Sequence, residues 1–94
     1  MIEAVKLWNE PNNMSHWDFE VDRGWTIFGD MVSQATAAVK AERADLTRVL
    51  GGISPIDPEF IRSLDRMNAL ADIDVVAVHG FPLDWNHWSI DEWP

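Results

Sequence analysis

The sequence predicts an α/β fold built from parallel strands, and three observations support this prediction. Three short β-favouring runs alternate with two segments whose apolar residues recur at helical spacing. Each helical segment is long enough to carry the chain back across a sheet, so consecutive strands are expected to run parallel. The chain has 94 residues, enough for one small domain. A (β/α)8 barrel uses about 31 residues per unit, so we expect a partial TIM barrel of about three βα units over 1–94.

The strands are expected at about 4–8, 46–51 and 73–78. The first run ends at Trp8, because the following Asn-Glu-Pro-Asn-Asn cluster favours a turn. The second run is closed by Gly51 and Gly52. The third is almost continuously apolar, which is typical of a parallel strand covered on both faces.

The helices are expected at about 24–43 and 58–69. The buried face of the first is predicted from spacings of three and four between its apolar residues, which are Phe28, Met31, Val32, Ala35 and Val39. The second has a start signal, with Asp57 as the capping residue and Pro58 at the first helical position. Its predicted buried face consists of Phe60, Ile61, Leu64 and Met67. The acidic residues Asp18, Glu20 and Asp22 are expected in a solvated loop and at the start of the first helix.

Composition excludes several classes of function. Seven Lys and Arg against sixteen Asp and Glu give a net charge of −9, which repels a phosphate backbone, so no nucleic-acid partner is expected. The absence of cysteine excludes a disulfide, a thiolate nucleophile and a zinc-thiolate site. The histidines lack the spacing of a metal-ligand pair, so no metal or cofactor is expected. No apolar run is long enough for a membrane span and no leader is recognised, so a soluble chain is expected, with its compartment open.

Aromatic and polar residues gather where the predicted strands end, the edge at which parallel α/β folds carry their chemistry. Trp8, Asn9 and Glu10 follow the first strand, and the third strand is followed by His79, Phe81, Trp85 and Trp88. Five of the six tryptophans lie at or beyond a strand end. A pyranose offers apolar faces for stacking and a rim of hydroxyls for polar partners, so this composition favours a carbohydrate ligand.

The run Leu7-Trp8-Asn9-Glu10-Pro11-Asn12 at a strand end resembles the Asn-Glu-Pro motif on the fourth barrel strand of the clan A retaining glycoside hydrolases. Together with His79-Gly80-Phe81-Pro82, it is most similar to the family 39 β-xylosidases. The resemblance covers essentially the whole chain as barrel strands four to six. It implies that Glu10 is the general acid/base, that Asn9 holds the sugar 2-hydroxyl, and that His79 and Phe81 line the sugar subsite. Trp8, Trp85 and Trp88 are further candidates for stacking on the sugar.

The sequence departs from this family in its second carboxylate. The family nucleophile is a glutamate at the end of the seventh strand, and this chain stops at Pro94. A retaining glycosidase needs two carboxyl groups about 5–5.5 Å apart. We therefore expect Glu10 to act in a parent enzyme that hydrolyses β-xylosides or related β-glycosides, and the isolated chain to be inactive.

Other interpretations remain open. Glu10 and Asn9 could be turn residues, His79 could be a hydrogen-bonded histidine at a sheet end, and the tryptophans could close loops. The alternative function is an inactive barrel fragment that self-associates and binds carbohydrate weakly at most. Because strands 4–8 and 73–78 would be outermost, each presenting unpaired backbone groups at its outer edge, we expect a homodimer or higher homo-oligomer.

Overall fold

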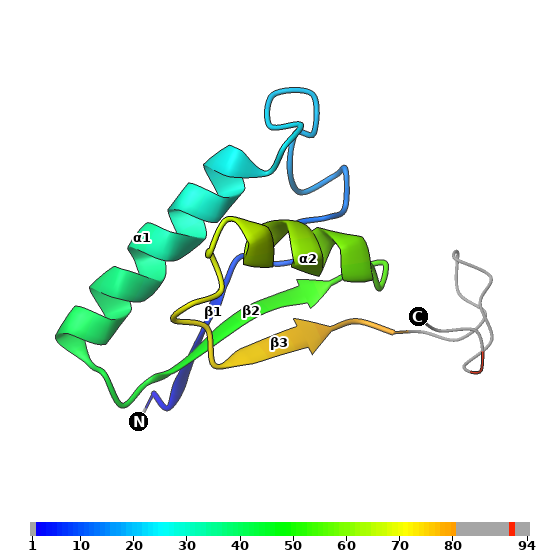
Figure 1. Cartoon of the computed structure of the whole chain (residues 1–94). Coiled ribbons are helices and arrows are strands. Elements are labelled where there is room, and N and C mark those ends of the chain that lie inside the picture. The colour runs from blue at the N-terminus through cyan, green and yellow to red at the C-terminus, as the bar shows by residue number, and fades with distance from the viewer. Residues whose placement is uncertain (1, 81–90, 92–94) are drawn as a thin grey trace.

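The computed structural model describes residues 2–80 and residue 91. These residues form three strands and two helices in the order β1 (Ala4–Leu7), α1 (Thr26–Glu42), β2 (Thr47–Ile53), α2 (Pro58–Arg66) and β3 (Val75–Val78). The strands make one parallel sheet in the order β1-β2-β3 (Figure 1). The predicted α/β alternation is therefore confirmed, and β1 and β3 are the outer strands of the described sheet.

One hydrophobic core joins both helices to the central strand. Its fully buried members are Phe28, Val32, Leu50, Ile53, Phe60, Leu64 and Ala69. Because α1 and α2 both contribute to this cluster, they pack on the same face of the sheet, as Figure 1 shows. The register row Lys6, Val49 and Val75 belongs to the opposite face, since side chains alternate along a strand. Val75 is 46% exposed there.

The third strand is not covered on both faces as its apolar sequence predicts. It begins at Val75 rather than at residue 73, because the Ile73 amide bonds back to the Leu70 carbonyl in a turn (3.1 Å). Val76 and Val78 are 39% and 53% exposed. Since β3 lies at the edge of the described sheet, its side chains lack neighbours that a central strand would have.

The second helix ends at Arg66, three residues before the predicted end. Asn68 adopts a left-handed backbone conformation (φ 60°), and the Ala69 amide bonds the Leu64 carbonyl at 3.0 Å. This arrangement satisfies a terminal carbonyl and stops the helix. Met67 was predicted on the buried face, but it lies beyond the helix and is 37% exposed. At the other end, the Asp57 side chain accepts bonds from two backbone amides, so the predicted cap is confirmed.

The first helix begins at Thr26, after Trp25 in a left-handed conformation (φ 63°). Its capping side chain is that of Asp22, in the loop that precedes the helix. The Asp22 carboxylate accepts hydrogen bonds from the backbone amides of Ile27 (3.0 Å) and Phe28 (2.8 Å). The predicted solvated position of Asp22 is wrong, because the residue is only 5% exposed.

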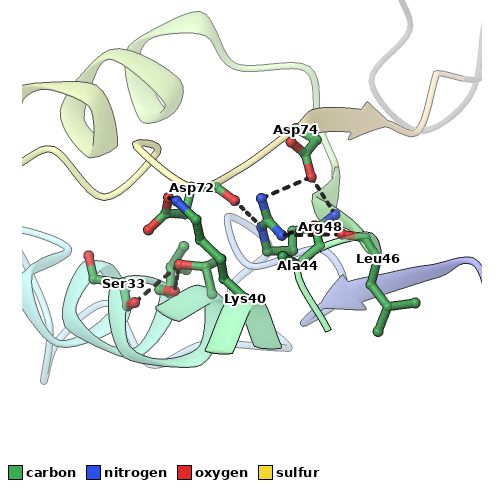
Figure 2. Close-up of polar contacts among 9 residues, drawn as sticks. Ser33, Lys40, Ala44, Leu46, Arg48, Asp72 and Asp74 are labelled. Atoms are coloured by element: carbon green, nitrogen blue, oxygen red, sulfur yellow. Dashed lines mark hydrogen bonds and ion pairs between the residues drawn. The ribbon is translucent and has the colours of Figure 1, made fainter. Parts of the chain in front are cut away.

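A buried arginine fixes the end of the sheet where the strands begin. Arg48 on β2 is 7% exposed and donates to the Asp72 carbonyl (2.6 Å) and to the carbonyls of Ala44 and Leu46 (both 3.3 Å), as Figure 2 shows. Its guanidinium also lies 3.5 Å from the Asp74 carboxylate. Through Arg48, the loops that precede β2 and β3 are held together.

Neither helix in the described part of the chain combines the length and the apolar character that a bilayer crossing requires.

Candidate functional site

The candidate site begins where β1 ends. The strand stops at Leu7, one residue before the predicted end near Trp8. Trp8 and Glu10 both adopt left-handed backbone conformations, with φ of 64° and 49°. Such conformations cost on the order of 1–3 kcal/mol each for residues other than glycine, and they often occur at functional sites. They turn the chain sharply across the sheet edge and present the Glu10 side chain there.

The Glu10 backbone is held at both ends. Its amide donates to the Gly52 carbonyl at 3.0 Å, and its own carbonyl accepts from the Asn13 amide at 3.0 Å. Gly52 belongs to β2, so this contact ties the loop after β1 to the neighbouring strand. The position of Glu10 is therefore set by the sheet and by its own turn.

The Glu10 carboxylate lies between two imidazoles. His79, directly after β3, places Nδ1 3.0 Å from Glu10 Oε1, within hydrogen-bond distance. His16 Nδ1 lies 3.6 Å from the other oxygen, Oε2. The side chain of Glu10 is 20% exposed, that of His79 33% and that of His16 41%. We call Glu10, His16 and His79 the strand-end cluster.

The strand-end cluster confirms that the sheet edge gathers residues far apart in sequence, since Glu10 and His79 are 69 positions apart. Among residues 2–80 and 91, no three His, Asp or Glu side chains form an arrangement suited to a metal ion. The partly exposed carboxylate can instead exchange protons and accept hydrogen bonds from a ligand.

Trp8 lies beside the strand-end cluster with a fixed ring. Its indole Nε1 donates to the His16 carbonyl (3.1 Å), and its ring meets Trp17 edge to face with 5.3 Å between centroids. Trp8 remains 46% exposed. Its polar atom is thus already used within the protein, and its exposed surface is available for stacking.

Asn9 is exposed and is oriented by a lysine. Lys6 Nζ donates to Asn9 Oδ1 at 2.9 Å. Because lysine has donors only, the amide oxygen must face it, and the Asn9 NH2 group points to other partners. In the described part of the chain, no hydrogen bond joins the Asn9 side chain to Glu10 or His79, so Asn9 lies next to the cluster without belonging to it.

The remaining predicted residues, Phe81, Trp85 and Trp88, lie outside the described residues. Two other tryptophans serve the core. Trp25, predicted inside the first helix, precedes it and meets Phe60 edge to face with 4.5 Å between centroids. Trp17 packs against Phe28 at 5.1 Å. Residue type alone could not distinguish Trp17 and Trp25, which pack against the core, from the exposed Trp8.

Two residues that build this edge were not among the predicted site residues. Asn12 is 8% exposed; its Nδ2 donates to the Pro55 carbonyl (2.7 Å) and its Oδ1 accepts from the Ser54 amide (2.9 Å). It thereby joins the loop after β1 to the loop after β2. Gly52 both accepts the Glu10 amide and contacts His79. Two sequence features could have identified them: Asn12 is the second asparagine of the Asn-Glu-Pro-Asn run, and Gly52 is one of two adjacent glycines near a predicted strand end.

Comparisons of the chain with protein-family models, with curated proteins and with solved structures give no match.

Proposed function

We propose that this chain forms three βα units of a (β/α)8 barrel and carries the acid/base side of a retaining β-glycosidase site, with Glu10 as the general acid/base. The observation that carries the proposal is the contact between Glu10 and His79, which come from the ends of β1 and β3. In (β/α)8 enzymes, catalytic residues come from the carboxyl ends of several strands, and this pair has that origin.

The winding of the sheet supports the barrel part of the proposal. The spatial order of the strands follows the sequence, and both helices share one face. A complete doubly wound sheet carries helices on both faces, but each of its three-stranded halves carries them on one face, so this arrangement is compatible with the barrel without being specific to it. Barrels keep all helices outside, so the face with Lys6, Val49 and Val75 corresponds to a barrel interior.

The chemistry assigned to Glu10 has two halves. Its protonated form gives a proton to the glycosidic oxygen as the bond to the sugar breaks, and its ionised form later takes a proton from water. The contacts of Glu10 within residues 2–80 are with imidazoles and backbone groups, and none is with another carboxylate. The proposal therefore assigns no nucleophile.

Sugar recognition is assigned to Trp8 and Asn9. The exposed part of the Trp8 ring offers a stacking surface for the apolar face of a pyranose. The Asn9 NH2 group, oriented by Lys6, can donate to a hydroxyl oxygen. A β-xyloside is the substrate class that the sequence resemblance favours.

An NMR titration of the chain with xylobiose tests this proposal. We expect weak binding, with shifts at the Trp8 indole, Glu10 and His79. Trp8→Ala should weaken binding about fivefold to tenfold, because stacking contributes on the order of 1 kcal/mol. Ile27→Ala, which removes another half-exposed apolar side chain (51% exposed), is the matched control and should leave binding unchanged. Equal weakening by both variants, or no shifts at the three residues, would contradict the proposal.

Hydrolysis of an aryl β-xyloside provides a second test. If the chain releases the phenol, alone or together with a segment that supplies a nucleophile, Glu10→Gln should abolish the release. Turnover that persists in Glu10→Gln would show that another group transfers the proton.

Self-association is a second candidate role, favoured by the apolar surface around β3. Three valines of this short strand, Val75, Val76 and Val78, are between 39% and 53% exposed. An apolar groove beside the strand is lined by Ile53, Ile56, Ile61 and Val78, together with Asp57, Pro58 and Arg62. Two copies related by a twofold axis could pair their β3 edges and form a six-stranded sheet.

A further inference from the structure

Gly52 lies under the His79 ring, and the ring could not keep this position if residue 52 had a side chain. A Cβ atom added to Gly52 would be 2.1 Å from His79 Nε2 and 2.4 Å from Cδ2, far closer than atoms can approach. Gly51, by contrast, has φ of 141°, a conformation that itself favours glycine. Gly52 has no such backbone conformation, so the imidazole is the physical reason for a glycine at this position.

Gly52 also positions Glu10, the residue that His79 contacts. The Gly52 carbonyl accepts the Glu10 amide at 3.0 Å while its Cα supports the His79 ring. One residue of β2 therefore sets the spacing between the loop after β1 and the first residue after β3. The 3.0 Å contact between Glu10 Oε1 and His79 Nδ1 therefore joins two residues that are both positioned by Gly52.

The hydrogen bond also determines where the imidazole proton lies. An ionised carboxylate only accepts, so a neutral His79 must carry its proton on Nδ1 to bond Glu10. Nε2 then has no proton and faces the glycine. Oε1 is used by this bond, while His16 Nδ1 at 3.6 Å is beyond hydrogen-bond distance of Oε2. Among the described residues, Oε2 is the carboxylate oxygen that accepts no hydrogen bond, so it is the freer of the two to exchange a proton with a ligand.

We infer that His79 is a positioning residue for Glu10, seated by Gly52, and that it holds Oε1 so that Oε2 is the acid/base oxygen. The consequence for catalysis rests on the proposed function. The positioning itself rests only on the contacts among Gly52, Glu10 and His79.

Long-range ¹H–¹⁵N NMR of the histidine rings tests the proton position. At about pH 8.5, where imidazoles in water are neutral, native His79 should be in the Nδ1–H form. Gly52→Ala should displace the ring and remove this preference. Gly24→Ala is the matched control, because its added Cβ would meet Thr26 Oγ1 at an ordinary 3.5 Å, and it should keep the Nδ1–H form. A native His79 in the Nε2–H form would overturn the inference.

Urea unfolding in a double-mutant cycle tests whether Gly52 is needed to leave room for the His79 ring. Gly52→Ala should raise the unfolding equilibrium constant by about tenfold or more in the native background, but by less than about threefold when His79 is already Ala. If Gly52→Ala does not fold alone, the double variant should still fold with about the stability of His79→Ala. A penalty of the same size in both backgrounds would overturn the inference.

Neither measurement uses a sugar, so the two proposals can fail separately. Suppose that His79 is in the Nδ1–H form and that the effects of Gly52→Ala and His79→Ala depend on each other, but the chain binds no xyloside. This result would support the positioning role and reject the proposed function. Xyloside binding together with an Nε2–H ring and an uncoupled cycle overturns the positioning role alone.

Discussion

Asp22 is a buried carboxylate with a defined electrostatic role. Burial alone would raise the pKa of Asp22, but hydrogen bonds from the Ile27 and Phe28 amides outweigh it and lower the pKa below its ordinary value. The Trp17 indole adds a third bond at 3.1 Å. The ionised side chain therefore caps α1 and anchors a core tryptophan at the same time.

Asp22→Asn should lower stability at neutral pH by about 1–2 kcal/mol, because a charged cap is replaced by a neutral one. Since the folded pKa of Asp22 is depressed, its contribution is present above the unfolded value of about 4 and is lost as pH falls through the folded value. Urea unfolding at several pH values should thus show a flatter acid dependence for Asp22→Asn. Glu20→Gln, at an exposed ion pair with Arg23, is the control and should change stability by less than about 0.5 kcal/mol. Parallel pH profiles of the native chain and Asp22→Asn would contradict this account.

At the scale of elements, β2 organises the molecule at both of its ends. Its beginning carries Arg48, whose guanidinium bonds three loop carbonyls, and its end carries Gly52, which contacts the strand-end cluster. The central position of β2 explains this, because a middle strand is adjacent to the loops of both neighbours. Figure 2 shows how the loops before β2 and β3 converge on the arginine.

Arg48→Met should destabilise the fold by about 2–4 kcal/mol, since the carbonyls of Ala44, Leu46 and Asp72 lose a buried donor while the aliphatic volume is kept. Denaturant unfolding with the linear extrapolation measures the change. Arg62→Met removes an exposed arginine paired with Glu59 on α2 and serves as the control, with an expected change below about 1 kcal/mol. If both variants lose the same stability, Arg48 does not hold the loops.

For the whole molecule, the apolar surface of β3 is the place where we expect a second copy of the chain to bind. We expect light scattering to show a dimer or larger species at micromolar concentration. Because each chain carries a net charge of −9, association should strengthen as salt screens the repulsion between copies. Val78→Lys should weaken it at least about tenfold, since a charged edge opposes strand pairing.

Val21→Lys is the matched control, because Val21 is also exposed (70%) but lies in the loop before α1. It makes the same change in charge and should leave association intact. A chain that stays monomeric at every salt concentration would remove self-association, and equal weakening by both lysine variants would exclude β3 as the contact.

Much of the fold could be predicted from residue patterns. Helical spacing identified Phe28, Val32, Phe60 and Leu64 as core residues, because a period near 3.6 places them on one face. The cap at Asp57 also followed from local sequence, since it depends on amides two and three residues away. The burial and capping role of Asp22 were not predicted, because it caps the helix from outside the usual position.

Three features could be read from residue patterns alone: the α/β alternation, the core faces of the helices, and the position of Glu10 and His79 after strand ends. These features depend on local periodicity and turn chemistry. Three features follow only from the three-dimensional arrangement: His79 bonds Glu10, Gly52 leaves room for the His79 ring, and Trp8 is exposed while Trp17 packs against the core. Such contacts depend on which strands become neighbours and how they are staggered, and no local pattern specifies the distance between residues 69 positions apart.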